Sequence, residues 1–139
     1  MTLQFTEDLL TGFSIIDEKH KMFIEKFNVL LDSFRTNSSE EVIDPLFDFL
    51  TKYVKEHFLE EETLMFKYAY SGYGQHKIEH QHISEKLEKI KDEYSISGAN
   101  MSNVTQMTEF LLRWFIDHIK RSDMQYKAYI EKKAKPAAN

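Results

Sequence analysis

The chain has 139 residues, of which 42% are hydrophobic, with a formal net charge of −5 and no cysteine. This length and composition predict a single globular domain over residues 1–139. The absence of cysteine excludes disulfides, zinc–thiolate sites and iron–sulfur clusters, and the acidic balance argues against a nucleic-acid partner. No apolar run approaches the roughly 20 residues of a membrane-spanning helix and no secretory signal is visible, so we expect a cytoplasmic protein without membrane insertion.

Apolar residues recur every three or four positions in four long segments, which is the pattern of amphipathic helices. The expected helices cover about 17–35, 39–66, 74–94 and 102–132. The residues before them lack this period and are expected to be irregular. Turn-forming residues separate the helices, the last of them around Gly98. Four amphipathic helices with short connections predict an all-α, up-down-up-down antiparallel four-helix bundle with an irregular N-terminal segment.

Capping residues mark the expected helix starts. Asp17 is the expected N-cap of the first helix. Ser38 and Glu41 have the spacing of a capping box ahead of the second helix. Pro45 follows in the opening turns of that helix, where it either kinks the helix or leaves Asp44 as the cap.

Histidines stand at positions where a bundle core normally carries leucine. Five of the six histidines fall on the apolar stripes of their helices: His20, His57, His76, His80 and His118. Glu61 lies four residues after His57, so both side chains are expected to face inward. A single histidine on an apolar face is usually a core residue with one hydrogen bond. Five of them beside a core glutamate would cost roughly 1–3 kcal/mol each if left unpaired, and a bound metal is the simplest partner for all of them.

The sixth histidine, His82, serves as an internal comparison. It falls on the polar face of the third helix near Lys86 and Lys89, and we expect it to lie on the surface. Its position shows that the chain does not bury histidine indiscriminately.

The donor types narrow the choice of metal. Imidazole with carboxylate suits iron, zinc, copper or nickel, and the absence of thiolate weakens the case for structural zinc. Five histidines and two carboxylates are too many ligands for one ion and suit two bridged ions. The glutamate-rich pattern of ferritin-like bundles is absent. A site rich in neutral nitrogen should stabilise high-valent iron less than an oxygenase does, which favours binding and release of dioxygen.

These residues resemble the hemerythrin family, in particular its free-standing form, bacteriohemerythrin. The motifs that carry the resemblance are IIDEKH, which ends at His20, HFLEE from His57 to Glu61, HKIEH from His76 to His80, and WFIDHIKRSD with His118 and Asp123. The resemblance extends from about Ile15 to Asp123. An ordered set of seven ligands on four helices makes it specific.

The resemblance implies a di-iron centre (Fe2+/Fe3+) with an oxo or hydroxo bridge and with dioxygen as its ligand. It implies that His76, His80 and His118 bind one iron. His20 and His57 would bind the other iron and leave it an open position for dioxygen. Glu61 and Asp123 would bridge the two ions.

Two local features follow from these assignments. His118 and Asp123 are five residues apart, which on a regular helix separates them by about 140°. They can share a site only if the helix widens or ends between them, as in a π-bulge. Apolar side chains are also expected around the open iron, and the spacing predicts a dioxygen pocket formed by Phe23, Phe58, Trp114, Phe115 and Ile119. Members of the family often carry leucine in place of Phe115, so the larger ring bears on the pocket volume.

The leading functional interpretation is a non-enzymatic protein for oxygen storage, delivery or sensing, and we expect a monomer. A di-iron oxidase or peroxidase with the same ligands is the alternative from the enzyme class. No separate general base accompanies the motifs, which argues against evolved catalysis. A nitric oxide or oxygen sensor module is a third possibility, weakened by the absence of a linker or output domain in this sequence.

Overall fold

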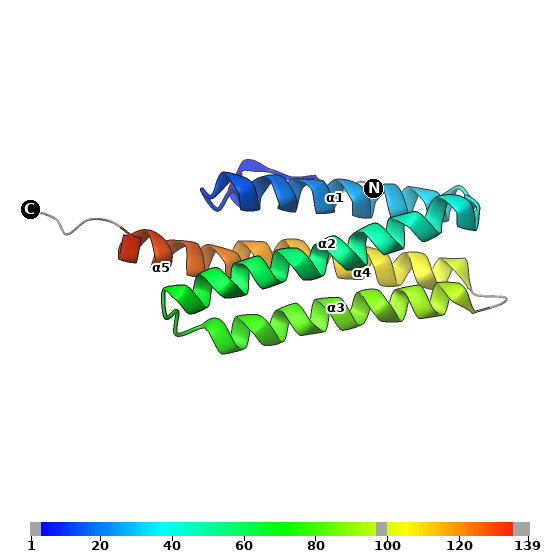
Figure 1. The fold of residues 1–139 in the computed structure, drawn as a ribbon. Helices are drawn as coiled ribbons and strands as arrows, with labels where there is room; N and C mark the ends of the chain where they lie inside the picture. The colour runs from blue at the N-terminus through cyan, green and yellow to red at the C-terminus, as the bar shows by residue number, and fades with distance from the viewer. Residues whose placement is uncertain (1–3, 97–99, 135–139) are drawn as a thin grey trace, which may run out of the picture.

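The computed structural model describes residues 4–96 and 100–134, and within them all regular structure is helical. The chain begins with a short 3-10 helix, η1 (Glu7–Leu9), followed by α1 (Ser14–Arg35), α2 (Glu40–Lys67), α3 (Tyr73–Ser95), α4 (Met101–His118), a π-helical segment η2 (Ile119–Asp123), and α5 (Met124–Ala134). The last three run end to end as one rod (Figure 1). Gly98, in the predicted third connection, lies outside the described residues.

The four rods form a closed antiparallel bundle, as predicted. Each packs against the next along the chain, and α4 also packs against α1. Short connections join consecutive rods at alternate ends of the bundle (Figure 1). None of the helices in the described ranges combines the length and the apolar character needed to cross a bilayer.

The predicted cap of the first helix is wrong. Helix α1 begins at Ser14, and Asp17 lies in its first turn. The buried Asp17 carboxylate instead accepts hydrogen bonds from the backbone N–H groups of Thr11 and Gly12 and from the Thr11 hydroxyl. The carboxylate therefore accepts hydrogen bonds from the preceding loop instead of capping the helix.

The start of α2 also differs from the prediction. Ser39 is the N-cap residue and makes no side-chain cap hydrogen bond, so the capping box of Ser38 and Glu41 does not form. The hydroxyl of Ser38 pairs with that of Thr36 at 3.1 Å. Pro45 lies inside the helix, and Asp44 is a helical residue rather than a cap. As the sixth residue of the helix, this proline lacks the N–H that would bond to the carbonyl of Glu41, and its ring crowds that carbonyl.

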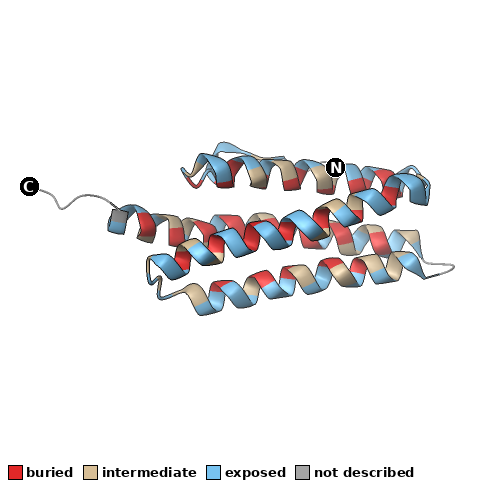
Figure 2. Ribbon diagram, viewed as in Figure 1, coloured by how far each residue is buried: buried red, intermediate tan, exposed pale blue. Residues whose placement is uncertain are grey.

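Buried side chains follow the inward faces of the helices (Figure 2). They form a large apolar core toward the α3–α4 end and a smaller one around Ile16, Met65, Tyr126 and Ile130. On each helix the buried histidines and acidic residues fall close to where the residues of one core give way to those of the other. The bundle thus holds a polar layer between two apolar ones.

Candidate metal centre

Seven polar side chains meet in this layer, and none is more than 2% exposed. They are His20 from α1, His57 and Glu61 from α2, His76 and His80 from α3, and His118 and Asp123 from the fourth rod. The structure brings together every residue that the sequence suggested as a metal ligand. His82, the internal comparison, is exposed, as predicted.

Carboxylate oxygens lie between the imidazole nitrogens. His57 Nε2 is 2.8 Å from Glu61 Oε1, and His76 Nε2 is 2.9 Å from Asp123 Oδ1. The second oxygen of Asp123, Oδ2, is 3.3 Å from His20 Nε2. Asp123 therefore reaches histidines of α1 and of α3 with its two oxygens.

The donor atoms divide into two sets, each with atoms within 4.8 Å of one another. One set is His76, His80, His118 and Asp123, and the other is His20, His57 and Glu61. Oε1 of Glu61 also lies 3.7 Å from His80 Nε2, across the division. The geometry thus offers two adjacent metal positions with a carboxylate from each set that reaches the other.

Unpaired atoms show that these residues fit a metal. The Nε2 atoms of all five histidines, Oε1 of Glu61 and both carboxylate oxygens of Asp123 are buried without a hydrogen-bond partner. Native structures rarely leave buried polar atoms unpaired, because each costs roughly 1–3 kcal/mol. Imidazole nitrogen and carboxylate oxygen are good ligands for divalent first-row metals. Two such ions would satisfy all of these atoms together.

The field inside the cluster favours positive charge. Burial alone would lower the pKa of His118, but Asp123, Glu79 and Glu61 together outweigh burial and raise that pKa to about 10. Burial opposes ionisation of Glu61 as well, yet His57 and His20 hold the pKa of this carboxyl well below its usual range. A metal cation placed among these groups would meet the same negative potential.

The π-helical segment η2 brings the last ligand into place. In a regular helix the side chain of Asp123 would lie about 140° from that of His118. The wider turn over Ile119–Asp123 removes this offset, and Asp123 Oδ1 lies 3.2 Å from His118 Nε2. The bulge predicted from the five-residue spacing is present.

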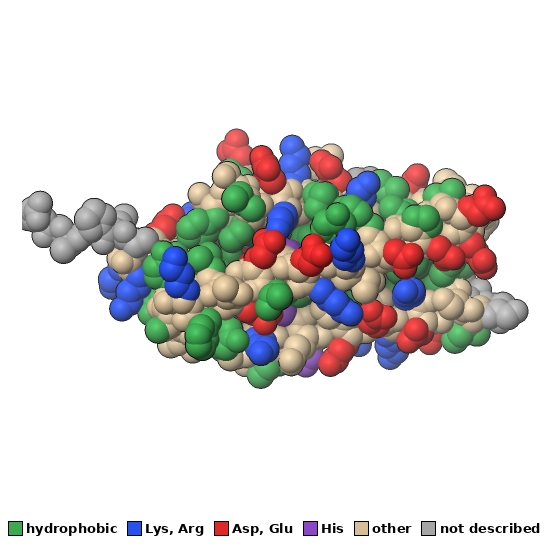
Figure 3. All heavy atoms as spheres, viewed as in Figure 1, with side chains coloured by type: hydrophobic (Ala, Val, Ile, Leu, Met, Phe, Trp, Pro, Cys, Tyr) green, Lys and Arg blue, Asp and Glu red, His purple; other side chains and the backbone are tan. Residues whose placement is uncertain are grey.

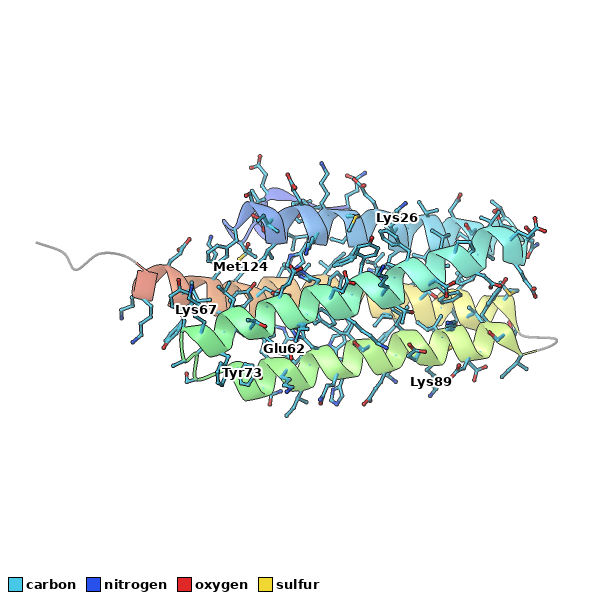
Figure 4. The ribbon with its side chains drawn as sticks, in the orientation of Figure 1. Lys26, Glu62, Lys67, Tyr73, Lys89 and Met124 are labelled. Carbon is cyan, nitrogen blue, oxygen red and sulfur yellow. The ribbon has the colours of Figure 1, made fainter. Side chains whose placement is uncertain are left out.

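Two glutamates outside the cluster contact the outer nitrogens of its histidines, and the sequence did not distinguish them from surface residues. Oε2 of Glu62 lies 2.8 Å from His80 Nδ1, on the side of α2 that faces α3 (Figure 4). Oε2 of Glu79 lies 3.8 Å from His118 Nδ1. The His118 ring and the hydroxyl of Ser122, against the opposing effect of burial, lower the pKa of Glu79 to about 2.

These contacts make the two sets of histidines unequal. Nδ1 of His80 is hydrogen-bonded to Glu62, whereas the Nδ1 atoms of His20, His57 and His118 are buried without a hydrogen-bond partner, and Glu79 comes only to 3.8 Å from His118. A carboxylate on the outer nitrogen orients a metal-binding histidine and makes it a stronger ligand. Glu62 therefore supports one ligand of the three-histidine set, and the two-histidine set has no such hydrogen bond among the described residues.

Tyr126 is a third residue that sequence reasoning missed. Its hydroxyl donates a hydrogen bond of 2.6 Å to Glu61 Oε2, which leaves Oε1 directed at the cluster. Burial first, and then the charges of Glu61 and Asp123, raise the pKa of Tyr126, so the phenol keeps the proton that it donates. In the sequence, its position three residues after Asp123 is the feature that could have identified it.

Phenylalanine rings surround the histidines on the side of the large core. The ring of Phe115 is 5.9 Å from that of His20, Phe23 is 5.4 Å from His57, and Phe58 stacks on the ring of His80 at 3.9 Å. Ile119, also suggested from the sequence, is fully buried beside them in the same core.

Trp114 packs against the same core but lies at its edge. It is half-buried, and its ring is 6.1 Å from that of the exposed His82. One helical step of 100° separates it from the inward-facing Phe115, which explains its position on the outer side. Phe27, which was not suggested from the sequence, packs against Phe115 at 6.2 Å in its place.

Comparison with known proteins agrees with this arrangement. The family model described as "Hemerythrin HHE cation binding domain" matches residues 11–130. The bacteriohemerythrin of Methylococcus capsulatus is 30% identical over 116 residues, which are 84% of this chain and 86% of that protein. The myohemerythrin of Sipunculus nudus is 28% identical over 121 residues, 87% of this chain and 88% of that protein. A crystal structure of wild-type hemerythrin superposes with a TM-score of 0.77 at 25% identity, covering 92% of this chain and 97% of that one. The chain therefore belongs to the hemerythrin family.

Proposed function

We propose that this protein binds dioxygen reversibly at a non-haem di-iron centre and serves oxygen storage, delivery or sensing. The observation that carries the proposal is the set of unpaired imidazole and carboxylate atoms that face one another in the buried polar layer. Membership of the hemerythrin family supports the same chemistry. When bound, two ferrous ions joined by an oxo or hydroxo group supply two electrons to dioxygen and recover them on its release.

The ligand assignment follows the two sets of donors. His76, His80 and His118 hold one iron, and His20 and His57 hold the other. Glu61 and Asp123 would bridge the ions, which is supported by their distances to histidines of both sets. With one imidazole fewer, the second iron keeps a coordination position for dioxygen.

The surrounding rings exclude water from the proposed dioxygen pocket. Phe23, Phe58 and Phe115 cover the histidines and are at most 3% exposed, and Ile119 is fully buried. Apolar walls exclude water and lower the local dielectric constant, which strengthens hydrogen bonds formed inside the site. Water reaching the oxygenated centre would promote loss of the reduced oxygen and leave inert ferric iron, so these side chains favour reversibility.

Metal analysis and one optical experiment test this function. Chain purified from iron-supplied cells should contain close to two irons. The reduced protein should develop new absorption bands in air and lose them on deoxygenation. A persistent single zinc would refute the proposal, and steady oxidation of an organic substrate by dioxygen or peroxide, without reversible oxygen binding, would assign the site to a di-iron oxidase or peroxidase instead. Optical spectra of the reduced protein recorded with nitric oxide in place of air test the third possibility, a nitric oxide sensor.

We also propose that the protein acts as a monomer in the cytoplasm. Charged side chains of both signs are interspersed over the face shown in Figure 3. The elution volume of the iron-loaded chain on size exclusion, compared across concentrations, would reveal a dimer if this is wrong.

A further inference from the structure

The tyrosines are unevenly distributed around the metal centre. Five of the seven belong to the small apolar cluster at the end of the bundle where the α2–α3 turn meets α5: Tyr68, Tyr70, Tyr73, Tyr126 and Tyr129. The rings that cover the histidines on the opposite side are phenylalanines. A phenol loses one electron and a proton at accessible potentials, whereas a phenyl ring does not. The proposed oxygen side is therefore lined with inert rings, and the other side with oxidisable ones.

Three of these tyrosines connect the centre to the surface. Tyr126 donates its hydroxyl proton to Glu61 Oε2 at 2.6 Å, and its ring is 5.3 Å from that of His76. The ring of Tyr70 is 6.5 Å from that of Tyr126, and the ring of Tyr129 is 5.1 Å from that of Tyr70. Tyr126 is fully buried, while Tyr70 and Tyr129 are half-buried and reach solvent. The path bridges the α2–α3 turn and α5, which lie side by side at one end of the bundle (Figure 1).

The structure holds the two outer rings in position. A Cβ atom on Gly72 would lie 2.7 Å from the ring of Tyr70, so only glycine leaves room for this ring. The hydroxyl of Tyr129 donates to the backbone carbonyls of Tyr68 and Ala69, at 3.0 and 3.1 Å. The turn between α2 and α3 thus fixes both rings relative to Tyr126.

We propose that Tyr126, Tyr70 and Tyr129 form a one-electron path that removes oxidising equivalents from the iron centre when it meets hydrogen peroxide. This inference rests on the iron centre of the proposed function and adds a protective activity to it. Without such a path, the oxidising equivalent would remain beside the histidine ligands.

The electrons and protons balance as follows. Hydrogen peroxide takes up two electrons and two solvent protons as its O–O bond breaks, and forms two waters. When the iron pair supplies only one electron, Tyr126 supplies the other and passes its phenolic proton to Glu61. Tyr70 then reduces the Tyr126 radical and releases its own proton to solvent, while Glu61 returns the first proton to Tyr126. Tyr129 reduces Tyr70 in the same way, with solvent exchanging the protons, and a soluble thiol finally gives a hydrogen atom to the Tyr129 radical. A second electron that passes along the same path restores the one supplied by the iron pair, and the two thiyl radicals formed combine as a disulfide.

Radical trapping tests the path. The full-length, iron-loaded ferric protein is treated with hydrogen peroxide and a nitroso spin trap, and peptide mass spectrometry locates the adducts and any oxidised histidines. We expect adducts on Tyr129 and Tyr70 and intact ligands. Tyr126→Phe, which removes one hydroxyl, should lower those adducts several-fold and increase oxidation of the ligand histidines. Tyr129→Phe should shift the adducts to Tyr70.

Tyr94→Phe is the matched control, because Tyr94 packs against Phe34 and Phe47 in the large core, apart from the tyrosine cluster. This variant should behave as the wild type does. Unchanged adducts in iron-replete Tyr126→Phe, or adducts as frequent on Tyr94 as on Tyr129, would overturn the path alone. A wild-type chain that retains no iron would overturn both the path and the proposed function.

Discussion

Three consecutive glutamates of α2 illustrate how one residue type takes three roles. Glu60 is exposed and forms an ion pair with Lys19. Glu61 is fully buried in the cluster, and Glu62 contacts the outer nitrogen of His80. Successive helical residues are rotated by 100°, so neighbours in sequence face solvent, the bundle interior and the adjacent helix in turn.

Glu62→Gln is expected to weaken metal retention without unfolding the chain. The amide keeps an oxygen near His80 Nδ1 but loses the negative charge that strengthens this ligand. Loss of such outer partners typically lowers metal affinity by about 10–100-fold. Iron transfer to a competing chelator measures the effect. Glu60→Gln, two residues away on the surface, is the control, and equal loss from both variants would show that the contact with His80 is unimportant.

Phe115→Ala should separate oxygen stability from metal binding. The ring is buried against His20 and Phe23, so its removal costs roughly 3–5 kcal/mol of folding stability. No ligand is lost, so iron content should persist while water enters and the oxygenated form decays faster. Stopped-flow mixing with dioxygen follows this decay. Phe110→Ala, an exposed position on the same helix, should change neither quantity. An unchanged decay in iron-replete Phe115→Ala would place the oxygen pocket elsewhere.

At the scale of elements, the N-terminal segment is attached to the bundle through Asp17. The segment packs its η1 helix against η2, and Leu9 is fully buried in the large core. Gly12 adopts a φ of +92°, which turns the chain so that its N–H reaches the carboxylate of Asp17. The attachment thus covers the π-helical turn that positions Asp123.

Asp17→Asn should loosen this attachment. Asparagine keeps the shape of the side chain but removes the negative charge from the group that accepts three hydrogen bonds. A hydrogen bond to a charged group contributes roughly 1.5–3 kcal/mol, so the free energy of unfolding in urea should fall by about that amount. Hydrogen exchange should accelerate at Thr11 and Gly12. Asp32→Asn, at an exposed position of α1, should leave stability unchanged, and an equal result for Asp17→Asn would contradict the assigned role.

At the scale of the whole molecule, metal binding and folding are one equilibrium. The bundle buries seven polar ligand groups at a single level. Left unpaired they would cost roughly 1–3 kcal/mol each, a sum comparable to the roughly 5–15 kcal/mol by which native domains are stable. Metal that binds only the folded chain contributes its binding free energy to stability.

A pair of histidine variants tests this linkage. His80→Ala removes a buried donor and should lower both iron content and the midpoint of thermal unfolding. His82→Ala changes an exposed side chain two residues away and should alter neither. Metal analysis combined with thermal unfolding of the same samples checks both quantities. Similar damage from the two substitutions would contradict the assignment of His80 to the metal centre.

The sequence by itself determined the four helices, their bounds to within three residues, the inward-facing histidines and the bulge between His118 and Asp123. All of these depend on the period of the helix, which is a local property of the chain. Only the tertiary structure decided which glutamate contacts which histidine, that Tyr126 donates to Glu61, and that Trp114 is only half-buried. These contacts depend on the rotation and relative height of packed helices. A shift of one residue turns a side chain by 100°, and packing of the whole bundle sets that angle.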